Sequence, residues 1–161
     1  TLNIDDLKSQ FEVLPWVKQV ILQRQFPNTI IVKIAEHNAL AHIGEEDLLA
    51  EDGEVFDGAD DSGLPTLYVS VDKASLAYAK YQQIESVITR HDDHITKLWM
   101  SDPRIIKFTT ESNLNITICD QDFATKLLEI DTYWDKLHQI NSQLSSMNFC
   151  YKNAVAINTA Q

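Results

Sequence analysis

The sequence predicts an α+β fold in which a mostly antiparallel sheet is flanked by helices. Apolar residues recur every three or four positions in three separate segments, a spacing typical of amphipathic helices. Between these segments lie short stretches in which apolar and polar residues alternate, which is typical of half-buried strands. Several strand-like stretches follow one another with only a turn between them, and this arrangement favours antiparallel pairing.

The start of the chain predicts a helix followed by a hairpin. Asn3 is a suitable N-cap, and Pro15 ends the helix. Residues 16–25 alternate as a strand, residues 26–29 form a turn around Pro27, and alternation resumes from Ile30. The apolar stripe of the helix comprises Ile4, Leu7, Phe11 and Leu14.

The rest of the chain predicts more strands and two longer helices. The turn Glu51-Asp52-Gly53 separates two short strands. The first of the two longer helices carries the apolar stripe Ala77, Tyr81, Ile84 and Ile88. The second helix carries the stripe Phe123, Leu127, Ile130, Trp134, Leu137 and Leu144. Strands are expected at residues 66–71, 95–101, 104–110, 114–119 and 147–157, and helices at residues 75–90 and 122–144.

The charge of the chain excludes some classes of partner. Its 161 residues include 13 Lys and Arg against 24 Asp and Glu, which gives a formal net charge of -11. Nucleic acid is therefore not an expected partner, because phosphate binding needs a basic surface. An anionic lipid surface would also repel the chain. No apolar run approaches the ~20 residues that a membrane-spanning helix needs.

The two cysteines, Cys119 and Cys150, lie far apart and lack the C-x-x-C spacing of a redox or zinc motif. The interpretation that we favour is a pair of small buried thiols. The alternative, a bridge formed in an oxidising compartment, stays open.

Neither a catalytic site nor a cofactor is expected. The chain lacks a nucleophile elbow, a P-loop and a dinucleotide-binding glycine motif. His91 and His94 flank Asp92 and Asp93, but this short connection lacks the further ligands that a zinc site needs. A metal is therefore not expected there.

The acidic loop that contains Asp57, Asp60 and Asp61 does not have calcium-binding spacing. Counted from Asp57, the sixth position is Ser62 where an EF-hand loop requires Gly. The twelfth position is Tyr68 where the loop requires Glu. We therefore expect a solvated acidic loop that binds no calcium specifically.

Residues 14–43, LPWVKQVILQRQFPNTIIVKIAEHNALAHI, resemble the FtsQ/DivIB family of bacterial cell-division proteins. The shared features are a Leu-Pro pair, a strand ending in a basic residue, an aromatic-Pro turn, a strand ending in Glu36, and a small-residue segment at residues 39–41. Further along, Leu48, Asp52-Gly53, Val55-Phe56 and Gly63-Leu64-Pro65 also fit the family. The late strand pair, the amphipathic helix and the final strand extend the resemblance over nearly the whole chain.

This resemblance implies the periplasmic region of a single-pass protein of the bacterial inner membrane. Residues 1–41 would form a partial POTRA domain that lacks its first strand and first helix, and residues 42–161 would form the family's β domain. One transmembrane helix would lie upstream. The family is not enzymatic: it acts as a divisome scaffold that binds FtsB and FtsL and controls septal peptidoglycan synthesis during septation. Other divisome proteins would bind through the POTRA domain.

An alternative function is a POTRA-containing chaperone of outer-membrane protein assembly or secretion. Such proteins carry repeated POTRA domains and then a long series of alternating strands. This chain has a single candidate POTRA domain and no such series, so we favour the divisome scaffold.

The resemblance places the partner-binding surface on the expected last strand and the helix before it, and a segment of FtsB would add beside that strand as a further strand. Tyr151 matches the family's tyrosine, whereas Cys150, Asn148 and Thr159 depart from its pattern. An open edge offers unpaired backbone groups that strand addition satisfies. The alternative, that Tyr151 is an ordinary surface residue, stays open. The expected partner-binding residues are Phe149, Tyr151, Lys152, Asn153, Ala154, Val155 and Ile157.

Overall fold

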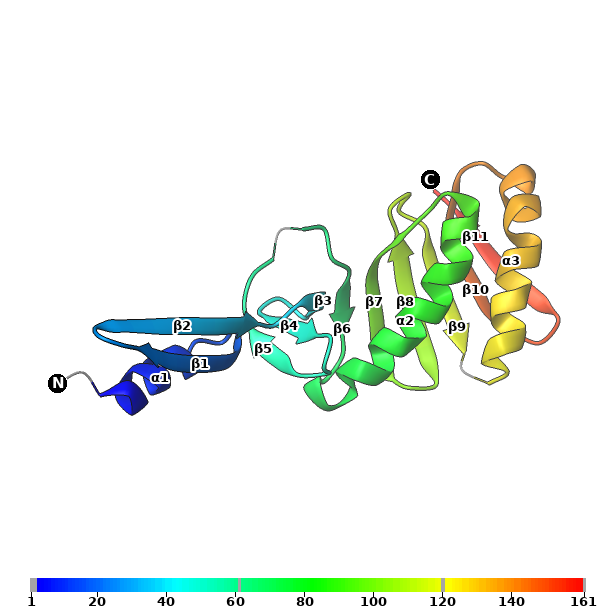
Figure 1. The fold of residues 1–161 in the computed structure, drawn as a ribbon. Helices are drawn as coiled ribbons and strands as arrows, with labels where there is room; N and C mark the ends of the chain where they lie inside the picture. Colours follow the sequence, from blue (N-terminus) through cyan, green and yellow to red (C-terminus); the bar gives the residue numbers. More distant parts are fainter. Residues whose placement is uncertain (1–2, 61, 120, 161) are drawn as a thin grey trace.

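A computed structural model describes residues 3–60, 62–119 and 121–160. The predicted α+β class is confirmed (Figure 1). The helices are α1 (Ile4–Glu12), α2 (Ala74–Ile88) and α3 (Phe123–Ile140), with short 3-10 turns at Val71–Lys73 and Thr89–His91. The strands are β1 (Val17–Gln25), β2 (Thr29–Glu36), β3 (Ala39–Ile43), β4 (Asp47–Ala50), β5 (Val55–Asp57), β6 (Thr66–Tyr68), β7 (Ile95–Asp102), β8 (Ile105–Thr110), β9 (Asn115–Cys119), β10 (Leu144–Tyr151) and β11 (Ala154–Thr159).

The predicted helix and hairpin at the start of the chain are confirmed. The side chain of Asn3 accepts a hydrogen bond from the backbone N–H of Asp5 at 3.0 Å and caps α1. Strands β1 and β2 pair antiparallel, and the partners Gln25 and Thr29 close the turn around Pro27. This hairpin extends away from the larger part of the molecule (Figure 1).

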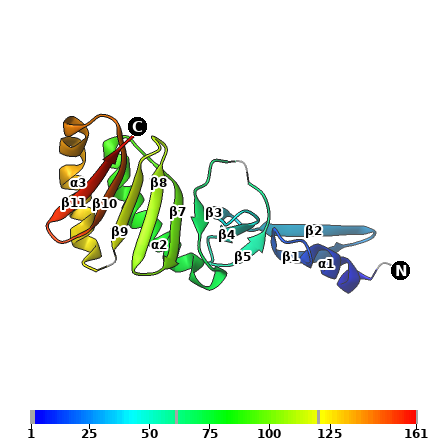
Figure 2. The ribbon, with the colours of Figure 1, turned by 180° about the vertical axis from the view of Figure 1, so that it is seen from behind.

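The larger part is a nine-stranded sheet in the order β11-β10-β9-β8-β7-β6-β3-β4-β5. Five of its strand pairings are antiparallel and three are parallel, so the predicted mostly antiparallel sheet is confirmed. Helices α2 and α3 cover one face of the strands from β7 onward, and the view from behind shows the strands in front of them (Figure 2).

The register of the sheet explains where the core lies. Consecutive pairings align one apolar residue from each strand, and this row lies against the helices. Ile84 and Ile88 of α2, together with Ile130 and Trp134 of α3, belong to the same core cluster as this row. Because side chains alternate across a strand, the adjacent residues lie on the other face, where one row is polar and contains Lys97, Thr109, Asn115 and Ser146. The apolar row is Leu67, Leu98, Phe108, Ile116, Met147 and Ile157.

The change from the small sheet to the large one lies between Glu36 and Ala39. Strand β3 pairs with β4 and β6, so its first residues, Ala39 to Ala41, belong to the larger sheet. The backbone N–H of His37 donates a hydrogen bond to the carbonyl of Trp16 at 2.9 Å, which ties this connection to the start of β1. The division of the chain into domains at residues 1–41 and 42–161 remains a proposal.

Four predicted boundaries were wrong. Helix α1 ends at Glu12, so Leu14 lies beyond the helix instead of in its apolar stripe. Helix α3 ends at Ile140, and Leu144 is the first residue of β10 instead of the last member of the helical stripe. The strand expected at residues 66–71 ends at Tyr68, because Val71 begins a 3-10 turn. The single strand expected at residues 147–157 is a hairpin of β10 and β11.

The chain reverses at Lys152 and Asn153, between the paired residues Tyr151 and Ala154. Asn153 has a φ of 55°, in the left-handed region that Asn adopts more easily than most residues. Phe149, Tyr151, Val155 and Ile157 lie at alternate positions on either side of the turn, as on one face of a continuous strand, which is why one long strand was predicted.

The interpretation of Cys119 and Cys150 as free thiols was also wrong. The two residues form a disulfide that joins the end of β9 to β10. These strands are parallel neighbours, although helix α3 separates them in the sequence. Their proximity therefore depends on how the sheet is assembled.

Candidate functional site

The candidate site lies at the β11 edge of the large sheet. Strand β11 pairs only with β10 in the described part of the chain, so the backbone groups along its other side have no strand partner. Val155 and Ile157 pack against the core, whereas Ala154 and Ala156 are exposed. The edge strand is six residues long, and the small side chains of Ala154 and Ala156 lie on its exposed face, which suits strand addition.

A buried cation holds the turn before this edge strand. The side chain of Lys126, from α3, is almost completely buried. Its Nζ atom donates hydrogen bonds to the backbone carbonyl of Tyr151 at 2.9 Å and to Oε2 of Glu129 at 3.1 Å. A buried ammonium needs such partners, because removing its charge from water is costly. The β10–β11 turn is therefore attached to α3 through one side chain.

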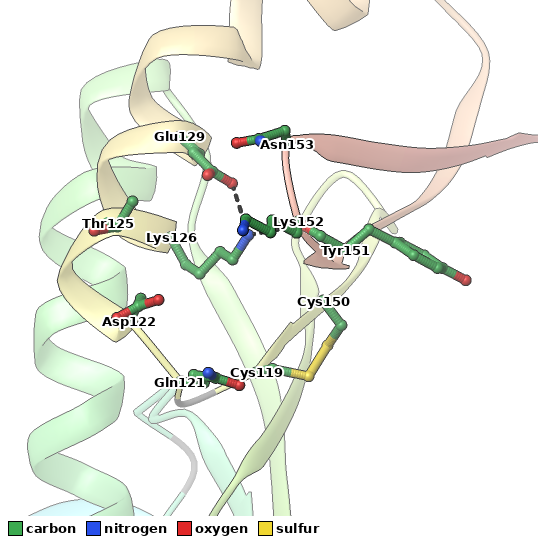
Figure 3. A pocket seen from close by; sticks show the side chains of 10 residues that line it. All are labelled: Cys119, Gln121, Asp122, Thr125, Lys126, Glu129, Cys150, Tyr151, Lys152 and Asn153. Atoms are coloured by element: carbon green, nitrogen blue, oxygen red, sulfur yellow. Dashed lines mark hydrogen bonds and ion pairs between the residues drawn. A yellow bond between two sulfur atoms is a disulfide. The ribbon is translucent and has the colours of Figure 1, made fainter.

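The disulfide holds the other side of the same turn. Cys150 precedes Tyr151 and is bonded to Cys119, so β10 is fixed covalently to β9 immediately before the chain reverses. Lys126 and the disulfide lie on opposite sides of a pocket of about 410 Å³ beneath the turn (Figure 3). The pocket is lined by Cys119, Gln121, Asp122, Thr125, Lys126, Glu129, Cys150, Tyr151, Lys152 and Asn153.

A second hollow continues along β11. It has a volume of about 350 Å³ and lies between α3 and the first residues of the edge strand. Glu129 and Asn153 line both hollows, so the two are adjacent. The second is more apolar, because Tyr133, Leu137, Ala154 and Val155 complete its lining. A chain that added to β11 would have a polar pocket at one end and an apolar one beside it.

The structure places the predicted partner-binding residues in three different environments. Phe149 is 0% exposed and belongs to the core, so its side chain is not accessible. Tyr151 is 53% exposed, and its ring points away from α3 (Figure 3). Lys152 and Asn153 form the turn, and only Ala154, Val155 and Ile157 lie on the edge strand itself.

Sequence reasoning missed one feature of the site and considered a second without favouring it. One is the position of Lys126, three residues after Phe123 and four before Ile130, which places a lysine within the apolar stripe of α3. A cation at such a position is a recognisable sign of a buried polar contact. The other is the disulfide, for which the sequence offers no comparable sign.

The histidines considered as metal ligands have other partners. His91 contacts Asp131 at 2.9 Å and stacks on Trp134, whereas His94 contacts Glu85 at 2.9 Å. Asp93 is buried and accepts hydrogen bonds from Ser112. Among the described residues, one cluster of three side chains is close enough to share a metal ion, and it lies away from these histidines. It consists of His37, Asp52 and Glu54.

The acidic loop is described only in part. The carboxylate of Asp60 accepts a hydrogen bond from the backbone N–H of Ser62 at 2.7 Å, and Asp61 lies outside the described residues. The side chain of Ser62, followed by its backbone N–H, holds the pKa of Asp60 below its usual range. The expectation that this loop binds no calcium stays a prediction. No helix among the described residues is long and apolar enough to span a bilayer.

Comparison with known proteins agrees with this architecture. Residues 1–37 match the FtsQ-type POTRA domain, and residues 39–150 match the C-terminal domain of the cell division protein FtsQ/DivIB. These two matches assign the chain to a class of bacterial cell-division proteins. The chain belongs to the FtsQ/DivIB family.

Individual relatives carry the same name. Cell division protein FtsQ of Acinetobacter oleivorans is 24% identical over 162 residues, which cover 98% of this chain and 57% of the relative. FtsQ of Allochromatium vinosum is 35% identical over 107 residues, 65% of this chain and 43% of the relative. FtsQ of Bordetella pertussis is 30% identical over 118 residues, 70% of this chain and 43% of the relative. The chain thus spans about half the length of these relatives.

Proposed function

We propose that this chain is the periplasmic region of a single-pass inner-membrane protein that acts as a non-enzymatic divisome scaffold. It binds FtsB and FtsL and thereby helps to control septal peptidoglycan synthesis. The observation that carries the proposal is the unpaired edge of β11, bordered by two hollows beside α3. The match of residues 39–150 to the FtsQ/DivIB domain favours this role over a chaperone of outer-membrane proteins.

The disulfide supports the proposed compartment. Disulfides persist in oxidising environments such as the bacterial periplasm and are rare in the cytosol. The Cys119–Cys150 bond therefore favours a periplasmic location for this region.

The β11 edge is better suited to a partner strand than the edge at the opposite end of the sheet. Strand β5 has only three residues, whereas β11 has six. Ala154 and Ala156 leave the face of β11 accessible, so another backbone can approach closely. An added strand of FtsB would satisfy the free N–H and C=O groups of β11. Tyr151, at the start of this edge, is the main exposed side-chain anchor.

Binding of the periplasmic region of the cognate FtsB tests the proposal. Tyr151→Ala and Ala154→Asp should each weaken binding, the first by removing the anchor and the second by placing a charge beside the added strand. Both positions are exposed, so the melting temperature should change little. The measurement is isothermal titration calorimetry, with the fold of each variant checked by circular dichroism.

Leu128→Ala is the matched control, because Leu128 is an exposed apolar residue of α3 that lines neither hollow. Its affinity for FtsB should equal that of the unmodified chain. Unchanged affinity in both the Tyr151 and the Ala154 variants would place the interface away from β11.

A further inference from the structure

The junction between the small hairpin and the large sheet contains a buried imidazole, that of His37, in which one ring nitrogen makes no hydrogen bond with a described residue. The side chain of His37 is only 5% exposed, and its ring stacks on Phe56 of β5 with 4.8 Å between the ring centres. Among the described residues, no group makes a hydrogen bond with its buried Nδ1 atom. An unpaired buried nitrogen is unfavourable, and each such atom in a native structure requires an explanation.

Two carboxylates face this ring from the β4–β5 turn. Oδ2 of Asp52 lies 3.7 Å from Nδ1 of His37, and Oε2 of Glu54 lies 3.5 Å from Nε2. One potential ligand atom from each of these three residues lies within 4.8 Å of the other two. The sequence brings Asp52 and Glu54 close together, but only the fold adds His37 from the end of β2.

The carboxylate of Asp52 is already held in place. Its Oδ1 atom accepts a hydrogen bond from the backbone N–H of Glu54 at 3.1 Å, and its Oδ2 atom lies 3.1 Å from Nζ of Lys18. The backbone hydrogen bond and the nearby ammonium hold the pKa of Asp52 below its usual range. The side chain of Lys18 is 51% exposed and can move into solvent.

We propose that His37, Asp52 and Glu54 form a binding site for a divalent zinc ion. The ion binds Nδ1 of His37, the nitrogen that lacks a partner, together with one oxygen from each carboxylate. The side chain of Glu54 is 69% exposed and can rotate to complete the site. Water occupies the fourth position of the tetrahedron.

The donor set favours zinc over the common hard cations. Zinc accepts imidazole nitrogen together with carboxylate oxygen, whereas calcium and magnesium bind through oxygen. Two carboxylates balance the charge of the ion. In the structure, the ammonium of Lys18 supplies the positive charge beside Asp52. A bound zinc ion would replace that ammonium.

A bound ion would join the two parts of the molecule. Lys18 lies on β1, His37 follows β2, and Asp52 and Glu54 lie in the β4–β5 turn. Both views place β5 where the hairpin meets the large sheet (Figures 1 and 2). Zinc at this point fixes the hairpin to the turn and raises the melting temperature of the chain, because a ligand that binds the folded state stabilises it.

Calorimetric titration of the EDTA-treated chain with zinc chloride tests the site. We expect one zinc ion per chain at micromolar concentration and none with magnesium chloride. His37→Gln and Glu54→Gln should each weaken binding at least tenfold, since the loss of even an outer-shell partner costs about 10–100-fold. Lys18→Met should tighten binding, because it removes a competing cation beside Asp52.

His94→Gln is the matched control, since His94 also contacts a carboxylate, that of Glu85, but has no second acidic ligand within the described ranges. It should bind zinc as the unmodified chain does. Glu54 is exposed, so its variant folds even where the His37 variant does not. Absence of micromolar zinc binding, or full affinity in Glu54→Gln, would overturn the proposal.

Discussion

Nζ of Lys126 lies 2.9 Å from the carbonyl oxygen of Tyr151 and donates a hydrogen bond to it across 25 residues of sequence. The bond connects the first turns of α3 to the reversal between β10 and β11. Glu129 accepts a second hydrogen bond from the same ammonium, so the charge is paired although it is buried. The shape of the candidate edge therefore depends on a residue that is not part of it.

Lys126→Met should destabilise the chain by about 1–3 kcal/mol, because it leaves the Tyr151 carbonyl and the Glu129 carboxylate without their buried partner. It should also weaken FtsB binding, since the turn is no longer attached to α3. Urea denaturation and calorimetric titration measure the two effects. Lys136→Met, at an exposed position of the same helix that lines neither hollow, should change neither quantity. Equal stability of the two variants would mean that the hydrogen bonds of Lys126 do not hold the turn.

Trp134→Ala should lower the free energy of unfolding by about 3–5 kcal/mol, the usual cost of removing a large aromatic side chain from a core. Trp134 is 5% exposed and packs between α3 and the sheet, as its place in the apolar stripe predicted. Urea denaturation checks the value. Leu128→Ala, on the exposed face of the same helix, should change stability by no more than about 0.5 kcal/mol. A loss below about 1 kcal/mol for Trp134→Ala would be incompatible with this packing.

Reduction of the disulfide should lower the free energy of unfolding by about 3–4 kcal/mol, the loop-closure value for this spacing. Cys119 and Cys150 are separated by 31 positions, so the bond restricts a loop that contains all of α3. Urea denaturation with and without a reducing agent measures the change. A variant with Ser at both positions should show the reduced stability under both conditions. If the reducing agent also lowered the free energy of unfolding of that variant, the loss of stability would not come from the disulfide.

Acid should destabilise the chain partly through Asp93. Burial alone would raise the pKa of Asp93, but hydrogen bonds from Ser112, Thr110 and the His94 backbone N–H outweigh it and hold the pKa below its usual range. Because the folded pKa is lower than the unfolded one, the stabilisation is complete above about pH 4 and is lost as the pH falls through the folded value.

Asp93→Asn should therefore lower stability at pH 7 by about 1–3 kcal/mol and flatten its decline in acid. Urea denaturation across this pH range gives both quantities. Asp92→Asn is the matched control, because Asp92 is the exposed neighbour of Asp93 and Asn tolerates its φ of 57°. An acid dependence of Asp93→Asn as steep as that of the unmodified chain would contradict this role.

The local elements were predictable because their causes are local. The cap at Asn3, the turn around Pro27 and the alternation on either side of it led to α1, β1 and β2. The stripe from Phe123 to Leu137 led to α3 and to the burial of Trp134. Side-chain periodicity reports which face of an element is buried, so these predictions needed no knowledge of the partner element.

The last hairpin shows where periodicity fails. Phe149, Tyr151, Asn153 and Val155 keep the alternation of one strand, yet the chain turns at Asn153. The left-handed backbone at Asn153 lets the chain reverse within two residues, Lys152 and Asn153, and spacing at alternate positions does not reveal such a short turn. Phe149 is buried in β10 as a result, whereas Ala154 lies on the edge strand.

Sequence alone determined the α+β class, the position of the small hairpin and the resemblance to the FtsQ/DivIB family, because each depends on residues close together in the chain. Only the tertiary structure brought Cys119 to Cys150, Lys126 to Tyr151, and His37 to Asp52 and Glu54. These contacts join different strands or a strand and a helix. Their distances follow from strand order and helix packing, which the periodicity of a single element does not contain.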